Sequence, residues 1–301
     1  MRVKSRWLAA AAVLCLLAGG GAMWLRSRAL RPATLLTRLP RRDALIVSID
    51  FDALRRAGIL QMLDGSNVEQ DPEYRSFVER TRFDYARDLD LAVAAFAPGG
   101  RFLLLRGRFD WKNLDAYVRS QNGQCDDSLC RMTGSAPDRL ISFFPLRSNL
   151  MALAVSQDDS AALRMSEPGP SDAMEIPDAP LWFSIPPSAL KSAGPIPDGA
   201  RPFADAIGQS DSAVLAFAPE NGRIAATLEI RCRKAGDAVE IAARLTSVTQ
   251  TLRDALAKSR QSDAASLSAV LAAGSFRADG PRVTGRWPIE KALLQSALGA
   301  K

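Results

Sequence analysis

Two parts of this chain match one another, and this repeat limits the possible folds more than any other property. Ser48–Gly58 (SIDFDALRRAG) shares Ser, Ile, Ala, Leu, a basic residue, Ala and Gly with Ser184–Gly194 (SIPPSALKSAG). Further along, Ala92–Pro98 (AVAAFAP) matches Ala213–Pro219 (AVLAFAP) in the same order. Ordered matches of this kind are typical of a repeated structural unit. We therefore expect two related halves, with an additional stretch in the first around residues 64–85.

Each half begins with the same two predicted elements. Apolar runs at Ala44–Ile49 and Leu181–Ile185 are too short for a helix and predict buried strands. A helix is expected after each strand. Asp52 and Ser188 occupy the same repeat position just before it, and their side-chain oxygens suit an N-cap.

A hairpin, a second helix and returning strands are expected to complete each half. Asp110 can cap the second helix of the first half, and Asp237–Lys258 has the apolar spacing of a long amphipathic helix. The β-α-β-β-α-β order predicts an α+β fold of two ferredoxin-like halves, which share one sheet or meet face to face around a groove. The expected hairpins are Leu91–Ala97 with Phe102–Phe109 and Ala213–Ala218 with Arg223–Cys232, and the returning strands are Leu140–Pro145, Leu150–Val155 and Ser275–Trp287.

These patterns divide the chain into five segments. Prolines mark the linker between the halves, and a mixture of Pro and Arg marks a semi-rigid spacer before the first half. The segments are 1–25 (tip and membrane anchor), 26–42 (basic spacer), 43–167 (first repeat), 168–180 (Pro-rich linker) and 181–301 (second repeat).

The net charge of +6 comes from the N-terminal region. All basic residues up to Arg42 precede the first acidic residue, Asp43, and the chain from Asp43 onward carries more acidic than basic side chains. A folded body of this charge lacks the basic surface that neutralises phosphates. Nucleic acid is therefore not an expected partner.

An uncharged apolar stretch, Trp7–Leu25, predicts a single transmembrane helix, with a tryptophan at the headgroup level near each end. The alternative is a cleaved signal peptide with an apolar region at Leu8–Leu17 and cleavage after Ala22. A lipoprotein is less compatible, because Leu14 precedes Cys15 where a small residue is usual. Basic residues flank the span on both sides and leave its orientation open.

The cysteines bear on the compartment. Cys125 and Cys130 are close together in a polar stretch and can close a small disulfide loop, which indicates an oxidising compartment. A pair of reduced thiols is the alternative. A zinc site would need two further ligands, and Cys232 is the only candidate that the sequence provides. We therefore expect the body to lie outside the cytoplasm.

The sequence contains no histidine, which removes the commonest transition-metal ligand and the usual general base near neutral pH. Asp50 and Asp52 could form an acid–base or metal pair, but the second half has Pro186 and Ser188 at these positions. Asp88 and Asp90 are read as a solvated strand start. We expect no catalytic, metal or cofactor site, and no enzyme activity.

The segments DALIVSIDFDALR (43–55), DLDLAVAAF (88–96) and RFDWKNLDAYV (108–118) resemble a family of uncharacterised bacterial membrane-anchored proteins with a duplicated α+β body. The resemblance covers most of Leu39–Met165 and is weaker after Pro180. It implies an envelope location and a non-enzymatic role. The family carries over no catalytic residues.

The sequence as a whole favours a non-catalytic, membrane-anchored interaction or scaffold protein of the bacterial envelope, with its body in the periplasm and a protein partner there. One alternative is a binder of a small apolar or lipid ligand between the two repeats. A second alternative is a histidine-free hydrolase that uses Asp50 and Asp52.

Overall fold

The computed structural model describes residues 32–60, 71–134, 136, 138–170, 175–191, 200–220, 223–258 and 267–289. The expected anchor, Trp7–Leu25, lies outside these residues. Among the helices of the described residues, none has the length and apolar character needed to cross a membrane.

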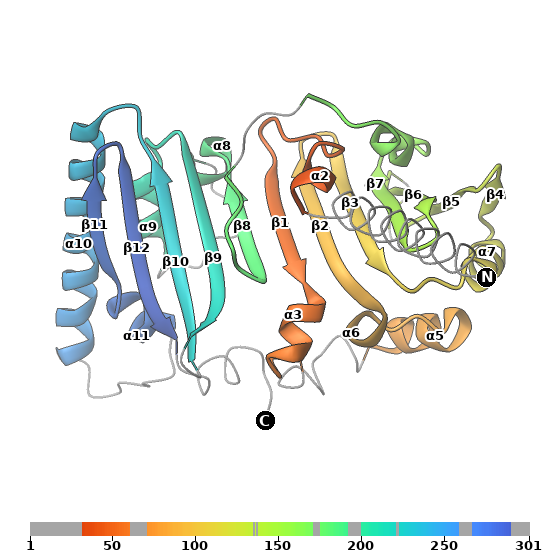
Figure 1. Cartoon of the computed structure of the whole chain (residues 1–301), viewed down its shortest axis with the longest axis horizontal. Helices are drawn as coiled ribbons and strands as arrows, with labels where there is room; N and C mark the ends of the chain where they lie inside the picture. The colour runs from red at the N-terminus through yellow and green to blue at the C-terminus, as the bar shows by residue number, and fades with distance from the viewer. Residues whose placement is uncertain are drawn as a thin grey trace, which may run out of the picture.

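The fold is α+β and is built on one large antiparallel sheet of 12 strands (Figure 1). Strands follow one another in the order β11-β12-β10-β9-β8-β1-β2-β3-β7-β6-β5-β4. The first half contributes α2 (Pro32–Leu36), β1 (Leu45–Asp50), α3 (Phe51–Arg56), α5 (Pro72–Thr81), α6 (Tyr85–Asp88), β2 (Leu89–Ala97), β3 (Gly100–Gly107), α7 (Trp111–Ser120), β4 (Gln124–Asp126), β5 (Leu129–Thr133), β6 (Leu140–Arg147), β7 (Leu150–Ser156) and the 3-10 helix η2 (Ala161–Met165). The second half contributes β8 (Leu181–Ile185), α8 (Pro187–Lys191), α9 (Arg201–Ile207), β9 (Ser212–Glu220), β10 (Arg223–Arg231), α10 (Ala235–Lys258), α11 (Leu267–Ala272), β11 (Ser275–Asp279) and β12 (Arg282–Ile289).

The two halves share this sheet, and β1 and β8 join them at its centre. Val47 lies opposite Phe183. These two residues are equivalent in the repeat, because they directly precede the aligned residues Ser48 and Ser184. This equivalent pair lies within the β1–β8 ladder, and the pairs Ile46–Ser184 and Ser48–Trp182 lie on either side of it. The arrangement around this point has an approximate two-fold axis.

The neighbouring strands also pair in the same register in both halves. Ile49 lies opposite Ala92 in the first half, and their counterparts Ile185 and Ala213 lie opposite each other in the second. Because a shift of one residue would turn every side chain to the other face, this common register gives both halves the same inward-facing set.

The order of strands differs from the ferredoxin-like expectation. In a ferredoxin-like unit the third strand lies between the first and the second. Here β1 pairs directly with β2, and β8 pairs directly with β9. Each half therefore begins as a run of antiparallel neighbours, with helices inserted between strands that are adjacent in the sheet.

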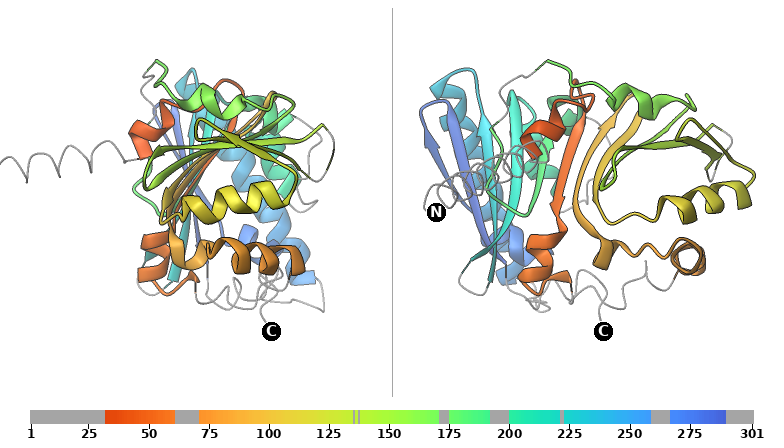
Figure 2. Two further views of the ribbon diagram at one scale, coloured as in Figure 1. Left: turned by 90° about the vertical axis from the view of Figure 1, so that its right-hand side faces the viewer. Right: turned by 45° about the vertical axis from the view of Figure 1, so that its right-hand side comes forward.

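Most helices pack on one side of the sheet, which we call the helical face. There, α3, α5 and α7 cover the first half, and α9, α10 and α11 cover the second. Figure 2 shows that the strands at the β4 end of the sheet curve around α7. The opposite face is covered in the first half by α2 and η2.

The expected basic spacer is shorter than its composition indicates. Leu35 and Leu36 of α2 and the following Leu39 are almost completely buried in the core over β1, β2 and β3. Arg38 donates to the backbone carbonyl groups of Met165 and Ser166 and so holds this segment against η2. The folded body therefore includes Pro32 and the residues that follow it.

Candidate functional site

Asp50 and Asp52 stabilise the first helix in two different ways. Asp50, not Asp52, is the N-cap of α3, and its carboxylate accepts a hydrogen bond of 2.8 Å from the N–H of Ala53. Asp52 lies in the first turn and forms ion pairs with Arg55 and Arg56. In the second half, α8 begins at Pro187, so Ser188 lies inside the helix and is not its cap. Both carboxylates thus have local structural partners.

Asp88 is buried, in contrast to the solvated position expected for it. Its carboxylate accepts from the N–H of Asp84 at 2.9 Å and pairs with Arg87 and Arg108. Burial acts to raise the pKa of Asp88, but these donors outweigh it and hold the pKa below its usual value. A paired carboxylate of this kind ties α6 to the end of β3.

A second polar contact joins α5 to α6. The hydroxyl of Tyr74 donates to Asp84 and accepts from the N–H of Tyr85, each at 3.3 Å. Burial, followed by the nearby charge of Asp84, raises the pKa of Tyr74 to about 12. The phenol therefore stays protonated across the physiological range.

Cys125 and Cys130 form a disulfide, as the sequence indicated. They lie opposite each other in the β4–β5 hairpin, whose turn residues Asp127 and Ser128 both have positive φ. Positive φ at both central residues is what a two-residue hairpin turn of type I′ requires. Cys232 is buried at the end of β10 in the other half of the sheet, and burial raises the pKa of its thiol. It therefore does not join the pair in a metal site.

Among the described residues, Asp115, Cys125 and Cys130 form the one group of three side chains with metal-ligand spacing. The disulfide occupies both sulfur atoms, so neither cysteine can act as a thiolate ligand. This group does not fit a metal ion.

The second half leaves the opposite face of its sheet without a helix, within the part of the chain that the structure describes. We call this surface the open face. In Figure 1, β9, β10 and β12 lie in front of the helices that cover their other side. A row of cross-strand neighbours, Ser184, Val214, Glu229, Thr284 and Arg277, runs across it. Its other residues include Thr227, Arg231, Asp279, Arg282 and Arg286.

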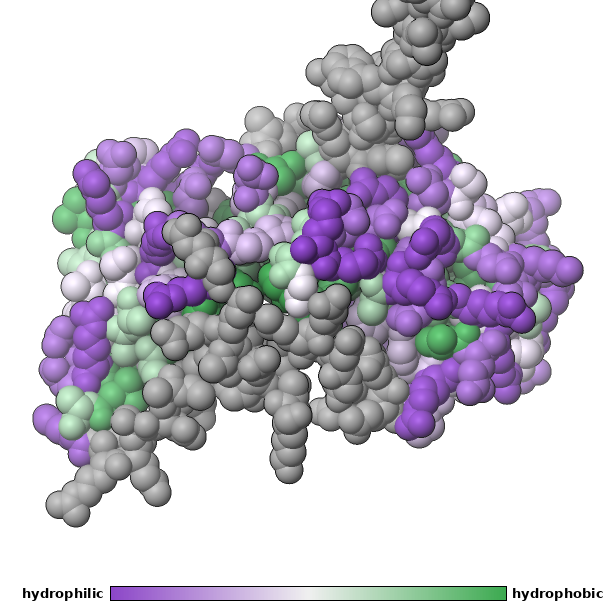
Figure 3. Space-filling model, turned by 60° about the horizontal axis from the view of Figure 1, so that its bottom comes forward, coloured by the Kyte–Doolittle hydropathy of each residue, from purple (hydrophilic) through white to green (hydrophobic). Residues whose placement is uncertain are grey.

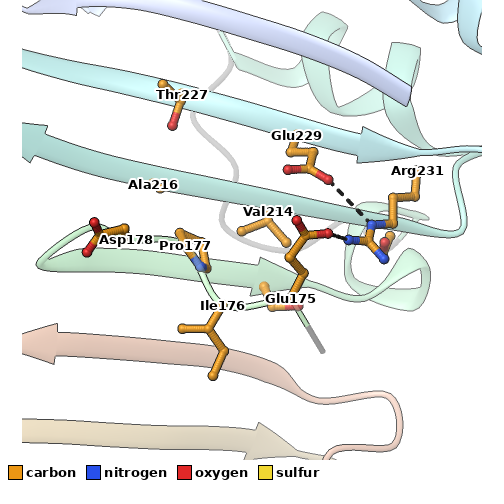
Figure 4. A pocket seen from close by; sticks show the side chains of 11 residues that line it. Glu175, Ile176, Pro177, Asp178, Val214, Ala216, Thr227, Glu229 and Arg231 are labelled. Atoms are coloured by element: carbon orange, nitrogen blue, oxygen red, sulfur yellow. Dashed lines mark hydrogen bonds and ion pairs between the residues drawn. The ribbon is translucent and has the colours of Figure 1, made fainter. Parts of the chain in front are cut away.

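A groove of about 450 Å³ lies where the segment 175–178 crosses the open face (Figure 4). Glu175 pairs with Arg231 of β10 and, at 3.6 Å, with Arg282 of β12. Glu229 reaches the same two guanidinium groups at 3.4 and 3.6 Å. The four charges form a network that fastens the segment between the repeats to two strands.

The chemistry of this groove suits binding. Its lining offers the hydroxyls of Ser184, Ser212 and Thr227 beside the charged network, together with small apolar side chains. Such groups can form hydrogen bonds with a ligand or with another protein.

A second hollow, of about 270 Å³, lies within the first half on the helical face. Its helix side is formed by Phe77 of α5 and by Leu114 and Tyr117 of α7, and its other wall by β3, β5, β6 and β7. An apolar ligand between the repeats is one of the alternatives that the sequence leaves open, and β1 and β8 pair directly at that junction. Two of the residues that line the hollow, Phe77 and Phe83, belong to the additional stretch of the first half, which has no counterpart in the repeat comparison.

Sequence reasoning missed both hollows for physical reasons. The open face carries the alternating polar residues of any solvent-facing strand, and the pattern does not report which helices cover the sheet. The lining aromatic residues look like ordinary core residues. Phe77 and Phe83 lie in the additional stretch, and this insertion was the one available signal.

No protein-family model matches the chain, and no curated protein matches its sequence. Solved structures of the protein TP0453 are similar to it. Crystal form I has a TM-score of 0.49 and 12% identity and covers 88% of this chain and 96% of that chain. Crystal form III has a TM-score of 0.48 and 11% identity, covering 88% and 98%, and crystal form IV has 0.47 and 9%, covering 88% and 96%.

Proposed function

We propose that this protein is a non-catalytic interaction protein of the bacterial envelope, whose protein partner binds the open face. The observation that carries the proposal is the unequal cover of the second half. Its helical face is packed under α9, α10 and α11, whereas the other side of the same strands presents charges and hydroxyls to solvent in the described structure. A sheet surface of this kind is suited to binding another protein chain.

The partner surface that we propose carries an acidic side chain opposite Arg277. Arg277, Arg282 and Arg286 lie together on β11 and β12. Arg286 is paired with Glu220, and Arg282 belongs to the charged network, but Arg277 forms no ion pair with the described residues. Complementary charge mainly increases the rate and specificity of association.

We place this surface near the membrane. In the proposed arrangement Trp7–Leu25 is an uncleaved anchor, and Pro32, the first described residue, begins α2 on the same side of the sheet as the open face. The residues between Leu25 and Pro32 span at most about 25 Å when fully extended. The disulfide supports an oxidising compartment, and therefore a periplasmic body. The partner would then be a protein at or near the inner membrane.

We also propose that the two halves arose by duplication. The support is the common register of β1–β2 and β8–β9 and the pairing of β1 with β8 about the equivalent residues Val47 and Phe183. Under this proposal the open face of the second half is equivalent to the surface that α2 and η2 cover in the first half. The second copy leaves the equivalent surface available to a partner.

The test is a comparison of partners captured from the native membrane. The full-length tagged protein is lightly cross-linked in cells, solubilised in mild detergent and analysed by quantitative mass spectrometry. Arg286→Glu reverses a charge on the open face, and Arg244→Glu reverses a comparable ion-paired arginine on the exposed side of α10. A near-stoichiometric partner should fall about tenfold with Arg286→Glu and stay unchanged with Arg244→Glu. Equal recovery with both variants would contradict the proposal, as would the absence of any partner.

A further inference from the structure

The hollow of the first half is apolar over its whole lining, apart from one hydroxyl. Aromatic rings of Phe77, Phe83 and Phe109 face leucine, isoleucine and methionine side chains of the sheet, and Tyr117 contributes the hydroxyl. Many of these side chains are only partly buried, although they are large and apolar. A ligand between them would remove further apolar surface from water.

The extent of the lining and the volume of this hollow limit the size of the ligand that fits it. Its sheet wall extends over four neighbouring strands from β3 to β5, and three interstrand steps span about 14 Å. Its volume of about 270 Å³ is nearly twice that of an engineered cavity of ~150 Å³ that binds benzene. A wall of this extent and a hollow of this volume suit a hydrocarbon chain that lies across the strands.

The wall also has the composition of an adaptable site. Met132 and Met151 line it from β5 and β7, and unbranched thioether side chains adjust to ligands of different length. On the helix side, α5 meets α7 through the edge-to-face contact of Phe77 and Tyr117, with ring centres 5.2 Å apart. This contact bounds the hollow and places the one hydroxyl beside it.

We propose that this hollow binds one alkyl chain of about ten carbon atoms, a size set by its volume. The chain has two potential sources, a free fatty acid or the acyl chain of a membrane lipid, and both present the same hydrocarbon. The site lies in the first half on the helical face and is independent of the open face. If the hollow binds no alkyl chain, the proposal that a protein partner binds the open face is unaffected.

The experiment is photo-cross-linking to the full-length protein in phosphatidylcholine nanodiscs. In one arm the probe is decanoic acid with a diazirine near the end of its chain, and unlabelled decanoic acid competes with it. In the other arm the diazirine is in the acyl chain of the nanodisc lipid. Labelled peptides are located by mass spectrometry. We expect saturable labelling of peptides that contain Phe77, Tyr117 or Met132, and the arm that produces it identifies the source of the chain.

Two variants test whether the label depends on the free volume. Leu153→Trp fills the hollow from β7, and the matched control Leu163→Trp makes the same change at an exposed residue of η2, on the opposite face. Labelling should fall about tenfold in Leu153→Trp and stay unchanged in Leu163→Trp. Ile141→Trp fills the hollow from β6 and replaces Leu153→Trp if that variant does not fold.

Three results would overturn the proposal. The first is an absence of labelling at the lining peptides in both arms, which would include the case in which another segment of this chain occupies the hollow. The second is non-specific labelling in both arms. In the first arm, unlabelled decanoic acid would then not reduce the labelling, and in the second arm the label would be spread over the protein surface. The third is undiminished labelling in a folded variant that fills the hollow.

Discussion

At the scale of single residues, Asp88 has the clearest dependence on pH. Its buried carboxylate has two guanidinium partners and a backbone donor, so its pKa is lower in the folded state than in the unfolded state, where it is about 4. A group with a depressed pKa stabilises the fold above its unfolded pKa, and this stabilisation is lost as the pH falls through the folded pKa.

Asp88→Asn should therefore lower the free energy of unfolding by about 1–3 kcal/mol at pH 7, because Arg87 and Arg108 lose their charged partner. Urea unfolding at pH 7 and pH 3 measures the effect. The difference from the original protein should shrink at pH 3, which lies below the unfolded-state pKa of about 4, because the unfolded chain then binds a proton at Asp88 that the folded chain has to release. Asp90→Asn, two residues away, is the control. An effect of Asp88→Asn that did not change with pH would contradict the assignment.

Thr249 is a second residue with a measurable consequence. Its hydroxyl is buried on α10 and has no hydrogen-bond partner among the described residues. Thr249→Val keeps the shape of the side chain and removes the unsatisfied oxygen, so the free energy of unfolding should rise by about 1 kcal/mol. Thr246→Val is the matched control, because that hydroxyl donates to the carbonyl group of Ala242 at 2.8 Å and is exposed. A loss of stability in Thr249→Val would show that the hydroxyl has a partner.

At the scale of the secondary-structure elements, the start of α3 distinguishes Asp50 from Asp52. Asp50→Ala removes the N-cap and should lower the free energy of unfolding by about 1 kcal/mol. Asp52→Ala removes exposed ion pairs and should cost about 0.5 kcal/mol or less. Chemical denaturation of both variants measures the difference. A larger loss of stability in Asp52→Ala than in Asp50→Ala would indicate that Asp52 is the N-cap.

The β4–β5 hairpin depends on its disulfide in a similar way. Closing a loop this short restricts the unfolded chain, so Cys125→Ser with Cys130→Ser should lower the free energy of unfolding by about 2 kcal/mol. A reducing agent should produce a comparable loss in the original protein and none in the double variant. Denaturation with and without the reductant gives both values, and equal stability under all conditions would refute the expectation.

The elements predicted well from the sequence are those with strong local signals. The strand Leu181–Ile185 is found with its predicted bounds, and the helix capped by Asp110 begins where its N-cap indicates. The pairing of β1 with β2, instead of with β3, was not predicted, because it depends on contacts between segments distant in the sequence. Leu35 and Leu36 were missed because arginines and prolines around them dominate the local composition.

The candidate site was harder to predict than the fold. The carboxylates that stood out, Asp50 and Asp52, have local roles in one helix. The residues of the groove, such as Glu175 and Arg231, come from the linker and from a strand of the second half. Their meeting depends on how the linker crosses the sheet, which no local pattern encodes.

At the scale of the whole molecule, the central strands make the two halves depend on each other. Trp182 of β8 is buried in the core that lies mainly over the first half. Trp182→Ala should therefore cost about 3–5 kcal/mol, and circular dichroism and cysteine accessibility should still report one transition for both halves. Separate transitions would show that each half folds by itself.

The location of the whole molecule can be tested without knowing its partner. Protease added to spheroplasts with an intact inner membrane should digest the body, because the proposed orientation places it outside the cytoplasm. A cytoplasmic protein measured in the same sample is the control. Protection of the body until the spheroplasts are lysed would contradict the proposed location.

The two ends of the sheet bear on how this protein avoids aggregation. Edge strands can recruit strands from other molecules, and proteins limit this by making such strands short or charged. At one end, β4 has three residues and is cross-linked to its neighbour. At the other, β11 exposes Arg277 and Asp279. These short or charged edges disfavour pairing with strands of other molecules. A sheet this wide can therefore stay free of edge-to-edge aggregation, which longer and uncharged edge strands would favour.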